Sequence, residues 1–213
     1  MRKIIKLTLL ICYFAIVPLT TVEAKISMPA FFSDSMVLQQ QTNVSLWGKS
    51  SFSEKQLIVH ASWDEKKYFV KTDKNGQWKV LIKTPKAGGP YSISLKDGGD
   101  DLILHDVLIG EVWLCSGQSN MEMPMKGFKN QSVEGSNMDI LKSTNPRLRL
   151  FTVKRNSTVA IQNNVDGKWL SADPLSVRDF SATAYYFGRL LQDILKVPVG
   201  LICSSWGGSP IEA

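Results

Sequence analysis

The stretch GEVWLCSGQSNMEMPM, residues 110–125, begins as an apolar run and ends in Ser, Gly, Gln and Asn. Residues 107–115 are almost continuously apolar, which predicts a strand that is covered on both faces. In α/β sheets, ligands bind at the carboxyl ends of strands, where loops carry the polar groups that strands exclude. The Ser119 hydroxyl follows such a strand and is a candidate nucleophile, in a loop supported by Gly117, Gln118 and Asn120.

A second passage from an apolar run to a polar loop comes near the end of the chain. The stretch ATAYYFGRLLQDIL, residues 182–195, predicts a helix that ends before Pro198, and residues 199–203 predict a buried strand that leads into SSWGGS. The apolar side chains of the helix form one broad stripe: Ala182, Tyr186, Phe187, Leu190, Leu191, Ile194 and Leu195. Residues 148–153 predict another strand, so this part of the chain has the helix-then-strand order of an α/β unit.

The two polar loops have the residue types needed for acyl transfer. A serine at a strand exit can act as a nucleophile whose own N–H faces the developing oxyanion, and paired glycines can offer a second N–H because no Cβ blocks the approach. Ser, Gly, Asn and Gln are also common in ordinary loops, and that interpretation stays open. His60 lies in an alternating strand and His105 at a junction, so we interpret both as structural or solvated.

The preceding part, residues 26–105, consists of short alternating runs. Apolar residues take every second position in two of them: Leu57, Val59, Ala61 and Trp63 in one, and Trp78, Val80 and Ile82 in the other. The DKNG sequence at 73–76 predicts a hairpin between FVKT and QWKVLI, and AGGP at 87–90 predicts a turn before YSISL. Strands at this spacing, with no long helical pattern among them, indicate a compact antiparallel β-sandwich.

The first 24 residues, MRKIIKLTLLICYFAIVPLTTVEA, have the basic head, apolar middle and small final residue of a secretory signal peptide. A membrane anchor is the alternative, but the uncharged stretch is short for a span and contains Pro18. A lipid attachment at Cys12 is a second alternative, although Ile11 is bulkier than the small residue usual there. We expect cleavage after Ala24, a periplasmic or secreted protein, and no stable membrane anchor afterwards.

Composition excludes several other classes. With 213 residues, 44% of them hydrophobic and 21% charged, the chain can bury a substantial core. Removal of residues 1–24 would lower the net charge from +6 to +4 (22 basic minus 18 acidic residues), a mild excess whose densest region, 126–155, lacks regular aromatic interleaving, so we expect no nucleic-acid partner. Cys115 and Cys203 are too few for a disulfide framework and are interpreted as buried thiols, with pairing left open. No cluster with metal-ligand spacing occurs in the sequence, so we expect no metal and no cofactor.

Four ordered motifs carry a resemblance to a known family. GEVWLCSGQSNMEMP, LRLFTV, FSATAYYFGRLL and VPVGLICSSWGGSPIEA together resemble the sialate O-acetylesterase family of the SGNH hydrolase superfamily. The earlier MPAFFSDSMVLQQ and DKNGQWKV are similar to the β-domain that comes first in these proteins. The resemblance implies an α+β chain: an antiparallel β-sandwich at 25–105, then the truncated start of a flavodoxin-like α/β esterase domain at 106–213.

The resemblance also implies roles for individual residues. Ser119 matches the family's nucleophile, and Gly208 matches the glycine that donates an oxyanion N–H, with Gly207 as its close competitor. Gln118 stands where many superfamily members have an acidic residue, and the GQSN form is that of the sialate esterase branch. The implied reaction is removal of acetyl groups from hydroxyls of sialic acids or related sugars through an acyl-serine intermediate, with an acetylated sugar as the substrate.

One expected part of the pattern has no match. The superfamily's third block and its late Asp-x-x-His segment, which supplies the base, are absent, so we expect the chain to be the amino-terminal part of a longer enzyme and inactive by itself. Two alternatives stay open: an esterase for plant polysaccharide acetyl groups such as those of acetylxylan, and a carbohydrate-binding protein in which the serine is incidental.

Overall fold

The computed structural model describes residues 25–99 and 101–209 of the chain. The signal peptide expected at 1–24 lies outside these residues. The strands are β1 (Ile26–Ser27), β2 (Val37–Gln39), β3 (Asn43–Ser50), β4 (Gln56–Ala61), β5 (Lys67–Lys71), β6 (Gln77–Lys83), β7 (Gly88–Lys96), β8 (Asp101–Gly117), β9 (Asn145–Thr152), β10 (Trp169–Ala172) and β11 (Val199–Ser205). The helices are α1 (Ser119–Glu122), α2 (Ser136–Leu141), α3 (Pro174–Arg178) and α4 (Ala182–Leu195).

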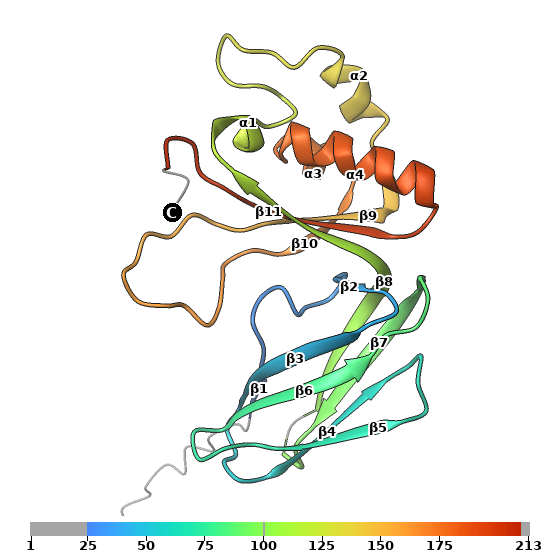
Figure 1. The fold of residues 1–213 in the computed structure, drawn as a ribbon, viewed down its shortest axis with the longest axis vertical. Coiled ribbons are helices and arrows are strands. Elements are labelled where there is room, and N and C mark those ends of the chain that lie inside the picture. Colours follow the sequence, from blue (N-terminus) through green and yellow to red (C-terminus); the bar gives the residue numbers. More distant parts are fainter. Residues whose placement is uncertain (1–24, 100, 210–213) are drawn as a thin grey trace, which may run out of the picture.

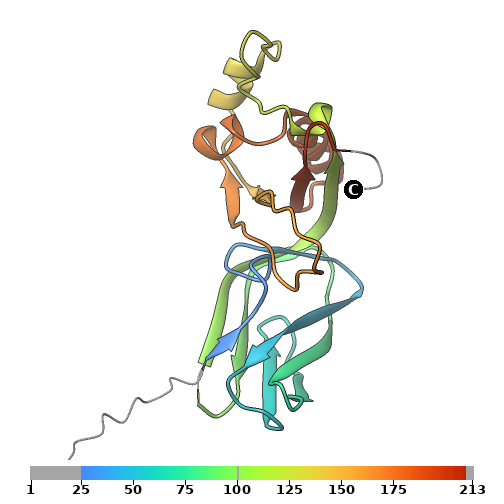
Figure 2. The same ribbon diagram turned by 90° about the vertical axis from the view of Figure 1, so that its left-hand side faces the viewer.

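Two sheets organise the described chain as a mixed α/β fold (Figure 1). One is three-stranded and antiparallel, in the order β1-β3-β6. The other runs β10-β9-β11-β8-β7-β4-β5, with β2 also paired to β8. All four helices lie at the end of the molecule where β8, β9 and β11 meet, and the strands up to β7 lie at the other end (Figures 1 and 2).

Strand β8 connects these two ends of the molecule. Its first part pairs antiparallel with β7, from Asp101 to Ile109, and its last part pairs parallel with β11, from Glu111 to Gly117. The domain boundary expected at residues 105 and 106 therefore falls inside a single 17-residue strand. Both halves of the molecule share this strand as part of one sheet.

Most of the alternating apolar residues predicted in 26–105 lie in the hydrophobic core. Leu57, Val59 and Ala61 of β4 are fully buried, and Trp78 and Ile82 of β6 are buried in the same cluster. Phe151, Trp169 and Ile202, from the other half, also pack in this cluster. The core between the two sheets thus continues beneath β9, β10 and β11.

The hairpin predicted at 73–76 is wrong as a pairing, although the turn is present. Gly76 N–H donates to the Asp73 carbonyl at 3.0 Å, which closes the turn. However, β5 pairs with β4 and β6 pairs with β3, so the turn crosses from one sheet to the other. The DKNG signal specifies local backbone geometry and not which strands pair.

The turn predicted at 87–90 is also wrong, because Gly88, Gly89 and Pro90 lie inside β7. The β7–β8 register shifts between Gly88 and Tyr91 and again between Tyr91 and Ile93. Glycine and proline mark an irregular strand here, since bulges and edge positions accept them as readily as turns do.

Helix α4 has the predicted limits but buries only part of the predicted stripe: Ala182 is buried, and Tyr186 and Leu191 are partly buried against the core. Ala184, Tyr185 and Gly188 are buried, whereas Leu190 and Ile194 are 60% and 67% exposed. A Cβ on Gly188 would lie 2.5 Å from Leu201 Cδ1, so the helix rests on β11 through its small residues. None of the helices in the described part of the chain reaches the length and apolarity needed to span a bilayer.

The expectation that 107–115 is covered on both faces holds only for its first half. Val107, Leu108 and Ile109 are buried, but Trp113 and Leu114 are 43% and 68% exposed. Among the described strands, only β11 pairs with β8 beyond Gly110. The apolar run continues past the point where neighbouring elements cover it.

An ion pair with one buried partner links the two halves. Arg149 of β9, whose side chain is only 4% exposed, donates two hydrogen bonds to the Asp106 carboxylate of β8, at 2.6 and 3.1 Å. Ser35 donates a third bond to that carboxylate at 2.8 Å. The hydrogen bonds from Arg149 hold the pKa of Asp106 below its ordinary value, against the opposing effect of burial.

Candidate active site

The polar loops after β8 and β11 lie side by side. The two strands are parallel neighbours, and Ser116 and Gly117 stand opposite Ser204 and Ser205 at their carboxyl ends. Beyond this point Trp206 N–H donates to the Gly117 carbonyl at 3.0 Å. The sheet topology therefore brings together Ser119 and the two glycines that the sequence singled out.

Ser119 opens a single helical turn directly after β8. Gly117 has φ +149° and its Cβ would lie 3.2 Å from Met121 Cβ, so glycine suits the exit of the strand. The turn is closed by the Met123 N–H, which donates to the Ser119 carbonyl at 2.9 Å. Ser119 itself is exposed, and within the described residues nothing hydrogen-bonds to its hydroxyl.

Helix α4 holds this turn in place. Thr183 Oγ1 donates to the Asn120 carbonyl at 3.0 Å, and the Ala182 N–H donates to the Met123 carbonyl at 2.8 Å. The supporting residues Gln118 and Asn120 thus act in different ways: Asn120 through its main chain, and Gln118 through its side-chain amide, which donates to the Ser209 carbonyl of the neighbouring loop.

The two glycines of that loop are required for different reasons. A Cβ on Gly207 would lie 2.6 Å from Glu122 Oε2 and 3.6 Å from Ser119 Cα, so this position lies directly against the serine turn. Gly208 has φ +81° but its Cβ would meet nothing within 4 Å. A side chain at 207 would have to displace the Glu122 carboxylate, whereas the positive φ at 208 favours glycine there.

Sequence reasoning missed a set of side chains around these glycines. Glu122 accepts a hydrogen bond from the Gly207 N–H and forms an ion pair with Arg155, whose guanidinium carbon lies 5.7 Å from the centre of the Trp206 ring. Glu122 follows Ser119 by three residues, a spacing that places both on one side of a helical turn. That spacing was the available signal for Glu122, whereas Arg155 has none in the sequence.

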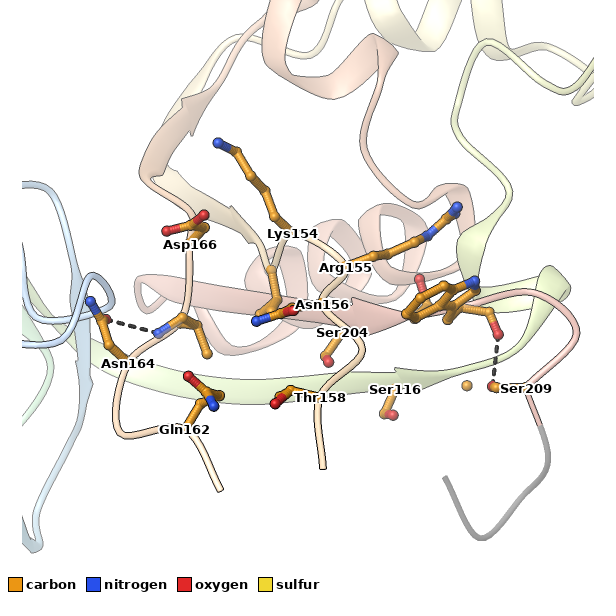
Figure 3. A pocket seen from close by; sticks show the side chains of 15 residues that line it. Ser116, Lys154, Arg155, Asn156, Thr158, Gln162, Asn164, Asp166, Ser204 and Ser209 are labelled. Carbon is orange, nitrogen blue, oxygen red and sulfur yellow. Dashed lines mark hydrogen bonds between the residues drawn. The ribbon is translucent and has the colours of Figure 1, made fainter. Parts of the chain in front are cut away.

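A polar hollow of about 740 Å³ opens beside the two strand ends. Its wall is formed by the ends of β8 and β11 and by the connection from β9 to β10, and Figure 3 shows the side chains around it. The lining residues with hydroxyl or amide groups include Ser116, Asn156, Thr158, Gln162, Asn164 and Ser204. Such groups can donate to and accept from sugar hydroxyls, while Trp206 adds an aromatic surface.

Other candidate reactive groups lie away from Ser119 or are inert. Cys115 and Cys203 stand opposite each other in β8 and β11 and are free and buried. Burial, together with the neighbouring Cys203, raises the pKa of the Cys115 thiol to about 11, and burial raises the pKa of Cys203 as well. Both thiols are therefore protonated at neutral pH and are poor nucleophiles.

Neither histidine is placed to activate the serine. His60 is in β4, far along the sheet, and His105 lies in β8 twelve residues before Gly117. An extended strand of that length spans about 40 Å at roughly 3.3 Å per residue. In the ranges 25–99 and 101–209, no cluster of three His, Cys, Asp or Glu side chains is arranged to hold a metal ion.

Comparison with known proteins finds close relatives for most of the chain. The chain is 34% identical over 199 residues to the sialate O-acetylesterase of Rattus norvegicus and 32% identical over 197 residues to that of Homo sapiens, covering 86% of this chain in each case. It spans only 36% and 38% of the lengths of these relatives. No family model matches the chain.

A solved structure shows the same similarity in three dimensions. A carbohydrate acetylesterase from Xanthomonas citri superposes with a TM-score of 0.82 and 34% sequence identity, over 89% of this chain and 42% of that one. Sequence and fold thus match enzymes of one chemical kind.

Proposed function

Because this chain is homologous to sialate O-acetylesterases over 86% of its length, we propose that it forms the nucleophile-bearing part of a serine esterase that removes O-acetyl groups from sialic acids or related sugars. The observation that carries this proposal is the placement of Ser119 at the carboxyl edge of the sheet, against the loop of Gly207 and Gly208. The hollow lined by hydroxyl and amide groups adjoins that edge and suits the sugar.

The same homology supports finer assignments. We assign residues 25–105 to an antiparallel β-sandwich domain and residues 106–213 to the first part of an SGNH-type α/β esterase domain, with β8 shared between them. We also propose export to the periplasm or the exterior, on the tripartite pattern of residues 1–24.

The proposed reaction is two-step acyl transfer. A base takes the Ser119 proton, Oγ attacks the acetyl carbonyl carbon, and the negative charge on the carbonyl oxygen is stabilised by the N–H groups of Ser119 and Gly208. Collapse of this intermediate expels the sugar hydroxyl, which receives the proton, and leaves acetyl-Ser119. Water then attacks the acyl carbon, and the base takes its proton; the bond from the acyl carbon to Ser119 Oγ breaks, Oγ receives the proton back from the base, and acetate leaves.

We assign the second oxyanion donor to Gly208 rather than Gly207. The Gly207 N–H already donates to the Glu122 carboxylate, whereas no described residue accepts from the Gly208 N–H. The base in this proposal lies outside the described residues, because the two described histidines, His60 in β4 and His105 near the start of β8, are both far from Ser119.

A fluorophosphonate probe tests the assignment of the nucleophile. Even without the base, an oxyanion hole and binding typically leave roughly 10³–10⁴-fold catalysis over water, so Ser119 should be labelled slowly but selectively. Peptide mass spectrometry should find the label on Ser119. Ser119→Ala should abolish it while Ser132→Ala, an exposed serine in the following loop, leaves it unchanged. Equal labelling of the Ser119→Ala chain would remove Ser119 from the mechanism.

A further inference from the structure

Glu122 joins three segments of the site through its two carboxylate oxygens. It lies on α1, one turn after Ser119. Its Oε2 accepts from the Gly207 N–H of the loop after β11, and its Oε1 pairs with the guanidinium of Arg155, which follows β9. The Glu122 side chain is only 20% exposed, so these contacts are partly shielded from water.

The hydrogen bond from the Gly207 N–H to Glu122 determines which backbone N–H of this loop is left without an acceptor. A hydrogen bond from an N–H to a carboxylate is roughly twice as strong as one between neutral groups, so it holds the Gly207 peptide firmly. Because a Cβ at Gly207 would lie 2.6 Å from Glu122 Oε2, a side chain at this position would have to displace the carboxylate from the contact. The next N–H, that of Gly208, is left without a described acceptor beside the serine turn.

Arg155 completes the arrangement. An unpaired carboxylate close to Ser119 would oppose a negative charge developing on the substrate oxygen, and the guanidinium offsets that charge. Arg155 is itself held over the Trp206 ring, one residue before Gly207. Its position therefore depends on the same loop that Glu122 fixes.

We propose that Glu122 is a positioning residue: it occupies the Gly207 N–H and so presents the Gly208 N–H to the oxyanion, with Arg155 as its counter-ion. This inference rests on the proposed role of Ser119. It assigns Glu122 no contact with substrate and no proton transfer.

The test compares two substitutions of Glu122 in the full chain. Glu122→Leu removes the acceptor, whereas Glu122→Gln keeps an oxygen for the Gly207 N–H. We expect Glu122→Leu to lower protection of the Gly207 amide in hydrogen exchange at least tenfold, and to lower the maximal rate of fluorophosphonate labelling of Ser119 by roughly 10²–10³-fold, the usual effect of losing an oxyanion donor. The probe concentration at half-maximal rate should change little. Glu122→Gln should keep higher Gly207 protection and a faster labelling rate than Glu122→Leu, and Glu134→Gln, at an exposed carboxylate, is the control.

The two readouts separate this inference from the proposed function. Equal labelling of the wild-type and Ser119→Ala chains refutes the proposed function, and exchange at Gly207 still decides whether Glu122 holds the loop. The positioning role is overturned if a folded Glu122→Leu chain loses no protection of the Gly207 amide. It is also overturned if that chain is labelled as fast as wild type. A Glu122→Gln chain as impaired as Glu122→Leu would overturn it as well.

Discussion

Replacing Asp106 by Asn should lower the free energy of unfolding by about 2–3 kcal/mol. Removing one partner of a buried ion pair typically costs about 3–5 kcal/mol, because the other charge is left uncompensated. Arg149 meets this condition, with a side chain only 4% exposed, but the Asp106 side chain is 42% exposed and water can partly replace it. The guanidinium also keeps its bond to the Pro146 carbonyl at 2.7 Å, so we expect a loss at or below the lower end of this range.

Urea unfolding measures the loss in the free energy of unfolding, and thermal unfolding measures the accompanying fall in Tm. For a chain of this size each kcal/mol corresponds to roughly 2–4 °C, so Tm should fall by about 4–12 °C. Asp179→Asn is a matched control, because its pair with Lys126 is about half exposed on both sides and should contribute less than about 1 kcal/mol. Together with the two single variants, the double variant Asp106→Asn with Arg149→Met completes a double-mutant cycle, which isolates the coupling free energy between the two side chains.

The pair should also make stability depend on pH. Because the pKa of Asp106 is lowered in the folded chain, its contribution is present above the unfolded pKa of about 3.9 and is lost as pH falls through the folded value. Wild type and Asp106→Asn should therefore converge in stability in acid. A loss no larger than that of Asp179→Asn at pH 7, or a difference that persists unchanged to low pH, would refute the argument.

Two further predictions concern buried groups of the second half. At pH 8, Cys115 should react with iodoacetamide roughly 100-fold or more slowly than a free thiol of pKa near 8.5, because its raised pKa of about 11 keeps it protonated. Cys203, whose pKa burial also raises, should likewise react more slowly than a free thiol, and both should react at once in denaturant; fast labelling of the native chain would contradict this. Gly188→Val should cost about 1–3 kcal/mol in urea unfolding by overpacking Leu201, and a Gly188→Val chain as stable as wild type would show that α4 does not rest on β11 as described.

Periodicity predicted the elements of this fold better than their surroundings. The limits of α4 and the buried face of β4 follow directly from the spacing of apolar residues. Which face of α4 is buried does not, because the close approach of Gly188 to Leu201 outweighs the hydrophobicity of Leu190 and Ile194. The side chains of both elements set the distance at which they pack. The sequence of one element alone therefore does not show which of its faces is buried.

The candidate site was predictable to a similar degree. The two polar loops were identified from strand ends, and parallel pairing of β8 with β11 brings them together. Arg155 was not identifiable, because it reaches Glu122 from a third segment whose position depends on the whole sheet. Contacts between segments distant in sequence are visible only once the topology is known.

Strand β8 also restricts how relatives of this chain can differ in length. Its residues alternate between faces with a period of two, so one residue inserted near Gly110 would leave the pairing with β7 intact and turn every later side chain to the opposite face. Cys115 would then leave the core beneath α4, and the serine turn would start from the wrong side of the sheet. Gly110 adds a second restriction, since any Cβ there would lie 2.0 Å from the Pro198 carbonyl oxygen at the start of β11. Insertions and deletions should therefore accumulate in the connection from β9 to β10, which runs along the edge of the hollow, while the number of residues between Gly110 and Ser119 stays constant.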